Sequence, residues 1–224
     1  MTGARRHTQD ELVVLVHGLY MHGIVMWPLQ RRLEQCGFSC RRFSYPSVRR
    51  SVAENAARLS ANLAEVQAPV VHFLCHSLGG LVVRSMLLRS GWQRPGRVLT
   101  LGTPHLGCYV AKRLGASAVL APLLGASLVH GLDGDLPPWP PGREVGTIAG
   151  NEPVGAGRMV PGLPKPNDGT VALAETRLGA DFPHRVLPVT HTSMLFSRRV
   201  ADEACVYLNT GRFAQTGTAS NSSL

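Results

Sequence analysis

The chain has 224 residues, of which 44% are hydrophobic and 17% are charged. This length allows one domain with a substantial buried core, and the composition excludes a disordered or collagen-like protein. Lys and Arg number 23 against 14 Asp and Glu, which gives a formal net charge of +9. The arginines occur in scattered pairs without interleaved aromatic residues. We therefore expect no nucleic-acid partner, and we expect that the net charge could attract the chain to an anionic membrane surface.

Five cysteines are present, an odd number without a C-x-x-C pair, at positions 36, 40, 75, 108 and 205. This usage is typical of free thiols in a reducing compartment. The first apolar run, Leu12 to Val16, is too short for the hydrophobic region of a secretory signal peptide. The sequence therefore predicts a cytoplasmic protein, and the cysteines lack the neighbouring ligands that a metal site needs.

The first third of the chain alternates apolar runs with segments of helical periodicity. Runs rich in β-branched residues predict buried strands, and apolar residues at intervals of three and four predict helices that lie on a sheet. The expected elements are a strand at 12–16, a helix at 27–35, a strand at 38–43 and a helix at 51–65. This order predicts a parallel sheet with helices on both faces.

The stretch from Val70 to Leu88 contains the most informative motif. Its apolar first part predicts a buried strand, which breaks at CHSLGG before a helical pattern begins. In a tight turn between strand and helix, Ser77 would expose its hydroxyl, and Gly79 and Gly80 would avoid collisions where the helix packs under the strand. The pattern is G-x-S-x-G with Cys75 in place of the first glycine. An ordinary helix cap is the alternative role for the serine.

The second half continues the alternation and contains one long uncharged run. The expected elements are strands at 97–101, 144–150 and 185–190 and a last helix that is capped by Thr192 or Ser193 and ends near Asn209. Pro188 predicts an edge position for the last strand. Residues 114–132 are long enough to resemble a membrane span, but the strands before and after them must share one sheet. This run predicts an apolar cap over a site or a pair of core helices.

Six motifs follow one another in register: LVVLVHGLY, FSYPS, CHSLGG, LGTPHLG, NDGTV and THTSML. With them the chain, from Leu12 to Leu208, resembles the α/β-hydrolase-fold lipases and esterases, and among these the bacterial lipase-like group related to GPI-inositol deacylases. The resemblance implies an α/β fold, a mostly parallel twisted sheet with helices on both faces and a small apolar cap. The implied division is a flexible N-terminus at 1–11, one hydrolase domain at 12–210 with a cap insertion at about 106–143, and a disordered tail at 211–224.

The resemblance also implies a catalytic triad in the chain order serine, acid, histidine. Ser77 would be the nucleophile, Asp168 the acid after one of the later strands, and His191 the base after the last strand. The backbone N–H groups of Leu19 and Leu78 would form the oxyanion hole.

Other side chains near these motifs are candidates for substrate contacts. His17 is expected to hold its loop by hydrogen bonds, Tyr45 borders the site or packs in the core, and His105 is a second candidate base at the end of a strand. The full set of substrate-contact candidates is His17, His76, Tyr45, His105, Leu123 and Leu124.

These expectations describe a serine hydrolase of carboxylic esters with short to medium acyl chains, which forms an acyl-enzyme and needs no metal or organic cofactor. The ester or lipid-like substrate is its expected partner. Two alternatives stay open: an acyltransferase or thioesterase that uses the same triad, and a non-catalytic binding protein with a hydrolase fold.

Overall fold

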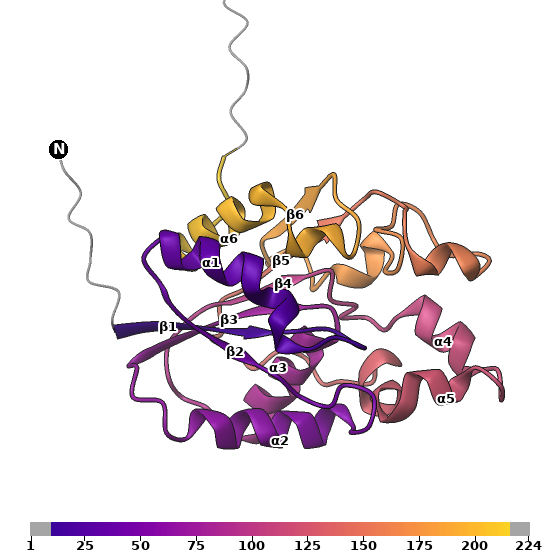
Figure 1. The fold of residues 1–224 in the computed structure, drawn as a ribbon, viewed down its shortest axis with the longest axis horizontal. Coiled ribbons are helices and arrows are strands. Elements are labelled where there is room, and N and C mark those ends of the chain that lie inside the picture. The colour runs from indigo at the N-terminus through magenta and orange to yellow at the C-terminus, as the bar shows by residue number, and fades with distance from the viewer. Residues whose placement is uncertain (1–9, 216–224) are drawn as a thin grey trace, which may run out of the picture.

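The computed structural model describes residues 10–215, in which six parallel strands form one sheet (Figure 1). The strands are β1 Glu11–Val16, β2 Ser39–Phe43, β3 Val70–His76, β4 Val98–Leu101, β5 Val145–Gly150 and β6 His184–Leu187. Their order across the sheet is β2-β1-β3-β4-β5-β6, and every neighbouring pair is parallel. The predicted α/β fold with a parallel sheet is confirmed.

Helices cover both faces of the sheet, and two short helices lie beyond its carboxyl edge (Figure 1). The helices are α1 Trp27–Gln35, α2 Val52–Leu63, α3 Leu78–Arg89, α4 Tyr109–Gly115, α5 Ala121–Leu124 and α6 Arg198–Thr210. Single turns of 3-10 or π helix lie at Gly23–Met26, Gly125–Ser127, Leu128–Leu132, Ala156–Met159, Leu173–Thr176 and Ser193–Leu195.

Strand β1 shows how one continuous apolar run supplies two cores. Val13 and Leu15 belong to the cluster that contains the buried residues of α1 and α6, whereas Val14 and Val16 belong to the cluster of α2 and α3. Successive side chains of a strand point to opposite faces, so a strand with helices on both faces must be apolar at every position. The continuous pattern therefore predicts a central parallel strand.

The N-terminal caps of α2 and α6 can be compared with the sequence. Ser51 and Glu54 form the capping box of α2. Helix α6, however, is capped by Ser197, whose hydroxyl accepts a hydrogen bond from the amide of Val200, and not by Thr192 or Ser193. Ser193 instead bonds to the amide of Thr190 across a tight turn, which delays the start of the helix.

The last strand lies at the edge of the sheet, as predicted from Pro188. The proline itself, however, follows the end of β6 at Leu187, because the chain leaves the sheet there and turns toward His191. The predicted strand at 185–190 was therefore too long at its end.

Residues 114–132, for which the alternative to a cap was a pair of core helices, form short helical pieces. Gly125 has a φ of +57° and lies so close to Val48 that a side chain could not be accommodated there. The amide of Ala126 donates to the carbonyl of Val48 over 3.0 Å, so this run rests on the loop before α2. Among the described helices, none is long and apolar enough to cross a membrane.

The predicted boundaries at the two ends shift by a few residues. Glu11 already belongs to β1, and the Phe213 ring lies 5.1 Å from the ring of Tyr207 in α6. Most of the predicted flexible N-terminus, 1–9, and of the predicted tail, 216–224, lies outside the described residues.

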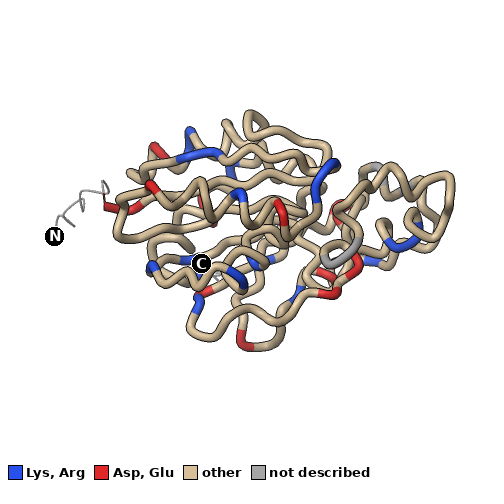
Figure 2. Tube along the Cα trace, turned by 90° about the horizontal axis from the view of Figure 1, so that it is seen from below, with Lys and Arg blue, Asp and Glu red and all other residues tan. Residues whose placement is uncertain are grey.

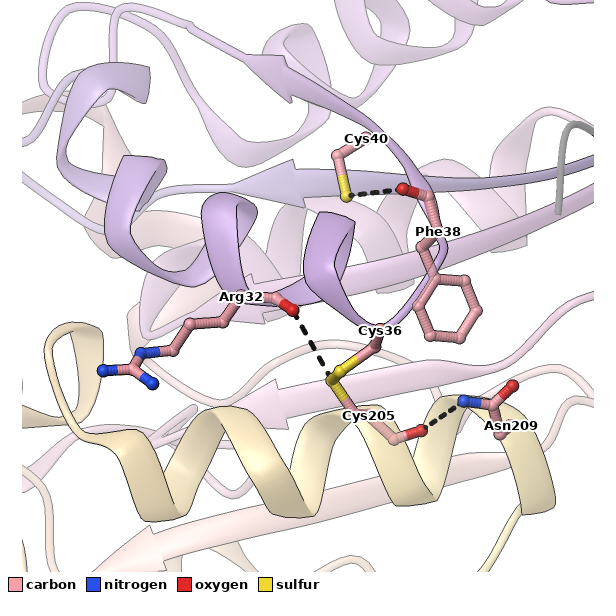
Figure 3. Close-up of a disulfide and its surroundings, with 6 residues drawn as sticks. All are labelled: Arg32, Cys36, Phe38, Cys40, Cys205 and Asn209. Carbon is pink, nitrogen blue, oxygen red and sulfur yellow. Dashed lines mark hydrogen bonds between the residues drawn. A yellow bond between two sulfur atoms is a disulfide. The ribbon is translucent and has the colours of Figure 1, made fainter. Parts of the chain in front are cut away.

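The prediction of free thiols throughout was wrong for two cysteines. Cys36 at the end of α1 and Cys205 in α6 form a disulfide, with their Cα atoms 6.3 Å apart (Figure 3). The two residues are 169 positions apart in the sequence, and only the packing of α1 beside α6 brings them together. Cys40, Cys75 and Cys108 are free thiols. The argument for a reducing compartment therefore loses its basis.

We expect Cys36→Ser to lower the free energy of unfolding by about 2–4 kcal/mol, since it opens a long closed loop in the unfolded chain. The measurement is urea unfolding in non-reducing buffer, with Cys40→Ser as the matched control at a free thiol. A reductant should lower the free energy of unfolding of the wild type to that of Cys36→Ser. Equal unfolding midpoints for the wild type and Cys36→Ser without reductant would contradict the expectation.

Candidate active site

Ser77 occupies a strained turn between β3 and α3. Its φ of 52° and ψ of −123° are unusual for a residue with a side chain, and within residues 10–215 the only other non-glycine residue with positive φ is Tyr20. Such a conformation costs about 1–3 kcal/mol and persists only where the surroundings enforce it. Two bonds do so: the Ser77 amide donates to Leu101 O over 2.8 Å, and the Thr103 hydroxyl donates to Ser77 O over 2.8 Å.

The two glycines after the serine allow the helix to approach the strands. A Cβ on Gly79 would lie 2.5 Å from the carbonyl oxygen of Val16, and one on Gly80 would lie 2.4 Å from the hydroxyl of Thr103. The start of α3 therefore packs directly on the ends of β1 and β4. Cys75, in place of the usual first glycine of the motif, is fully buried within β3 and does not disturb the turn.

Asp168 and His191, from two different loops, form a close pair. The Asp168 Oδ2 lies 2.7 Å from Nδ1 of His191, and the His191 amide donates to the Asp168 carbonyl oxygen over 2.7 Å. The second carboxylate oxygen accepts from the amides of Thr170 at 3.0 Å and Val171 at 2.7 Å. With Asp168 only 1% exposed, both oxygens of the carboxylate are engaged by protein groups and its orientation is fixed.

Ser77 and His191 line the same cavity, whose volume is about 200 Å³. It opens at the carboxyl ends of β1 and β3, where the order of the strands reverses and where ligands of open α/β sheets bind. Much of its wall comes from the segment that follows β4: Cys108, Val110, Ala111, Leu114, Leu124 and Leu132. The structure thus brings a hydroxyl, an imidazole and an apolar wall together.

Two backbone amides are available near the serine. Leu78 is the first residue of α3, so its N–H has no acceptor within the helix. Leu19 lies in the turn after β1 and lines the cavity. Tyr20, which follows it with a φ of 58°, is held by a bond of 3.1 Å from its amide to the hydroxyl of Ser47.

His17 holds the loop after β1, as expected from the sequence. Its Nδ1 bonds to Gly18 O over 2.9 Å, and its Nε2 accepts from the amide of Tyr45 over 3.2 Å, so the ring is neutral with the proton on Nδ1. Burial lowers the pKa of His17 to about 4. Tyr45 stacks on this ring and donates its hydroxyl proton to His17 O over 2.7 Å. Neither residue lines the cavity.

His105 lies away from the cavity, although Pro104 before it is part of the wall. Its Nε2 lies 3.1 Å from the hydroxyl of Thr100, and its ring meets Trp139 edge-on. Burial lowers the pKa of His105 to about 3. The ring of His105 is thus engaged by Thr100 and Trp139 and does not line the cavity, which disfavours it as an alternative base.

The two leucines predicted to contact substrate differ in their surroundings. Leu124 is 4% exposed and lines the cavity, whereas Leu123 is 52% exposed and lies outside it. Successive residues of a helix point in directions about 100° apart, so only one of the two can face the site. His76 also lines the cavity.

Sequence reasoning missed a buried arginine in α3. Arg84 donates to the carbonyl oxygens of Pro137 at 2.7 Å, Leu136 at 2.8 Å and His105 at 3.2 Å. These carbonyls lie on both sides of the segment that walls the cavity, so one side chain fastens its two ends. The available signal was a single charge in the middle of the otherwise uncharged run 78–88.

Glu175 makes a second connection that the sequence did not indicate. Its carboxylate accepts from the amide of Tyr109 at the start of α4 and from the amide of Ala172, over 2.8 Å, in the loop that carries Asp168. Burial raises the pKa of Glu175. In the described part of the chain, no group of three His, Cys, Asp or Glu residues could hold a metal ion.

Replacing Arg84 by Met should leave buried carbonyls without donors, each at a cost of about 1–3 kcal/mol. We expect a lower unfolding midpoint and faster cleavage by trypsin within 106–143, followed by mass spectrometry. Arg89→Met, at an exposed position of the same helix, is the matched control. If both variants resisted trypsin equally well, Arg84 would not fasten the segment.

No family model and no curated protein matches this chain. Solved structures do. The mature Bacillus licheniformis lipase BlEst2 has 21% identity and a TM-score of 0.73, with 94% of this chain and 96% of that chain covered. The metagenomic carboxyl esterase MGS0156 has 17% identity and a TM-score of 0.67, with coverage of 90% and 76%.

A further solved structure is a thioesterase domain, NocB from the nocardicin cluster. It has 18% identity and a TM-score of 0.59, with 90% of this chain and 95% of that chain covered. At such identities the likeness establishes architecture and leaves activity open. The chain therefore has the α/β-hydrolase fold that these lipases and esterases share.

Proposed function

We propose that the protein is a serine hydrolase of carboxylic esters, with Ser77 as nucleophile, His191 as general base and Asp168 as its partner. One observation carries the proposal: the histidine that is paired with a buried carboxylate at 2.7 Å lines the same cavity as the serine of the strained turn. A nucleophile and a base in one cavity, with an orienting group bonded to the base, are the parts that acyl transfer requires.

The reaction would begin when Nε2 of His191 takes the hydroxyl proton of Ser77 while Oγ attacks the ester carbonyl. Asp168 keeps the other proton on Nδ1 and stabilises the imidazolium that forms. The amides of Leu19 and Leu78 would donate to the oxyanion. The alcohol then leaves with the proton from His191. Water, deprotonated by the same ring, attacks the acyl-enzyme; the bond from the acyl carbon to Oγ breaks, His191 returns the proton to Oγ of Ser77, and the carboxylic acid is released.

The apolar wall of the cavity supports substrates with short to medium acyl chains. A volume of about 200 Å³ suits a small acyl group and is too small for the long chains of a triglyceride. Each methylene buried against the wall contributes up to about 0.8 kcal/mol, close to fourfold in affinity. The contribution of Leu114, Leu124 and Leu132 to the wall supports the prediction that part of the run 114–132 is a cap over the site.

A thioester would be attacked by the same groups, and one of the similar structures is a thioesterase domain. Transfer of the acyl group to an alcohol acceptor would likewise share the acyl-enzyme. We keep both as the second candidate, and a comparison of oxygen and sulfur esters of one acid would distinguish hydrolysis of thioesters from that of esters.

Two finer proposals rest on the sequence. The relationship with the group of GPI-inositol deacylases is supported by the motifs around Ser77, Asp168 and His191. Peripheral attraction to anionic membranes is supported by the net charge of +9 and by exposed apolar side chains such as Tyr20 and Leu106. Basic and acidic residues are interspersed along the chain (Figure 2), so the attraction would come from net charge and would weaken with salt.

The nucleophile can be tested with a fluorophosphonate probe and an aryl ester. Wild type should be labelled at Ser77, and Ser77→Ala should lose about 10³-fold or more in kcat because the triad acts as a unit. Thermal unfolding should show that the variant is folded. Ester hydrolysis that survives in Ser77→Ala, or labelling at another residue, would refute the assignment.

The acyl wall can be tested with two neighbouring leucines. Leu124→Trp should fill the cavity and lower kcat/KM for hexanoyl esters relative to acetyl esters, by close to fourfold for each methylene excluded. Leu123→Trp, at the exposed position, should leave the profile unchanged. The measurement is kcat/KM for a series of soluble aryl esters. A profile that shifts equally in both variants would mean that acyl selectivity is set elsewhere.

A further inference from the structure

His76, the residue before the nucleophile, is fully buried at the carboxyl end of β3. Side chains alternate along the strand, and Leu74, two residues earlier, packs in the cluster of α1 and α6. The ring of His76 therefore points to the face of the sheet over which the loop after β6 passes. This loop carries His191, and the two rings lie 4.8 Å apart between centroids.

The hydrogen bonds of His76 fix its tautomer. Its Nε2 lies 2.8 Å from the carbonyl oxygen of His191, and a carbonyl can only accept, so Nε2 carries the proton. The Nδ1 atom is buried without a partner among the described residues and packs against Gly18, where a Cβ would lie 3.0 Å away. A proton on Nδ1 would have no acceptor, and burial lowers the pKa of His76 to about 3.

His191 is consequently held at three points. Asp168 accepts from its ring at Nδ1 and from its amide, each over 2.7 Å, and His76 donates to its carbonyl oxygen. The first two bonds set the base relative to the acid. Of these three bonds, only the third relates the base to β3, whose last residue, His76, directly precedes Ser77.

We infer that His76 is a positioning residue, which fixes the general base relative to the nucleophile through its Nε2–H bond to the backbone of His191. The inference rests on the proposed triad of Ser77, Asp168 and His191 and adds a fourth side chain to it. The ring of His76 lines the cavity, but its single donor is used within the protein and is not left to donate to a substrate. A neutral ring is needed here, because a second cation beside His191 would oppose formation of the imidazolium.

The test removes the donor of His76, replaces it or shortens its reach. His76→Leu removes it, His76→Gln places an amide donor near the position of Nε2, and His76→Asn carries an amide too short to reach the carbonyl. His105→Leu is the matched control, a buried histidine whose ring lies outside the cavity. The measurements are kcat and KM for an aryl ester, the rate of fluorophosphonate labelling and the unfolding midpoint.

We expect His76→Leu and His76→Asn to lose about 10- to 100-fold in kcat and labelling rate, since a displacement of about 1 Å between reacting groups has an effect of this size. KM should change little, and His76→Gln should recover most of the loss. His105→Leu should lower the unfolding midpoint and keep kcat. If His76→Leu does not fold, the comparison of the Gln and Asn variants tests the same donor.

Equal losses in the Gln and Asn variants, or wild-type kcat in His76→Leu, would overturn the positioning role. Failure of the proposed function gives a different result, because wild type itself would then be neither labelled at Ser77 nor active on the ester. In that case the inference falls together with the triad.

Discussion

The close contact between the start of α3 and the ends of β1 and β4 is the constraint on which the site depends. No side chain fits at Gly79 beneath the carbonyl of Val16, and Ser77 must adopt a φ of 52° to complete the turn. The strain is offset by the burial of α3, which is covered along most of its length. The serine is thus exposed to the cavity by a core helix that cannot move without opening the hydrophobic cluster of α2 and α3.

Buried polar groups hold the loops at the carboxyl edge of the sheet, where the hydrogen-bonding ladder ends. His17 bonds to the loop after β1, His76 to the loop after β6, and Arg84 to the two ends of the segment around α4 and α5. Burial lowers the pKa values of both histidines, so they act as neutral donors and acceptors. Loop positions near the cavity are therefore fixed by side chains and do not depend on strand pairing.

The disulfide and the cavity lie at different parts of the fold and serve different purposes. Cys36 and Cys205 join α1 to α6 on one face of the sheet, whereas the cavity wall beyond the strands is built from short helical turns (Figures 1 and 3). Glycines such as Gly115 and Gly125 allow these turns to approach neighbouring segments closely. The short helical pieces of the wall have fewer internal hydrogen bonds than a long helix. Their stability therefore depends on tertiary hydrogen bonds such as those of Arg84.

The sequence alone determined the elements whose signals are local. Periodicity, glycine placement and motif order predicted the helix at 27–35, a parallel sheet with helices on both faces, the turn at Ser77, and the position of Asp168 and His191 after late strands. The tertiary structure decided which distant segments meet: the disulfide of Cys36 with Cys205, the turn of His105 away from the cavity, and the choice of Leu124 over Leu123 as a wall residue. Local patterns record the environment of each residue along its own helix or strand. Contacts between residues that are far apart in the sequence form only when the helices and loops pack together and bring those residues side by side.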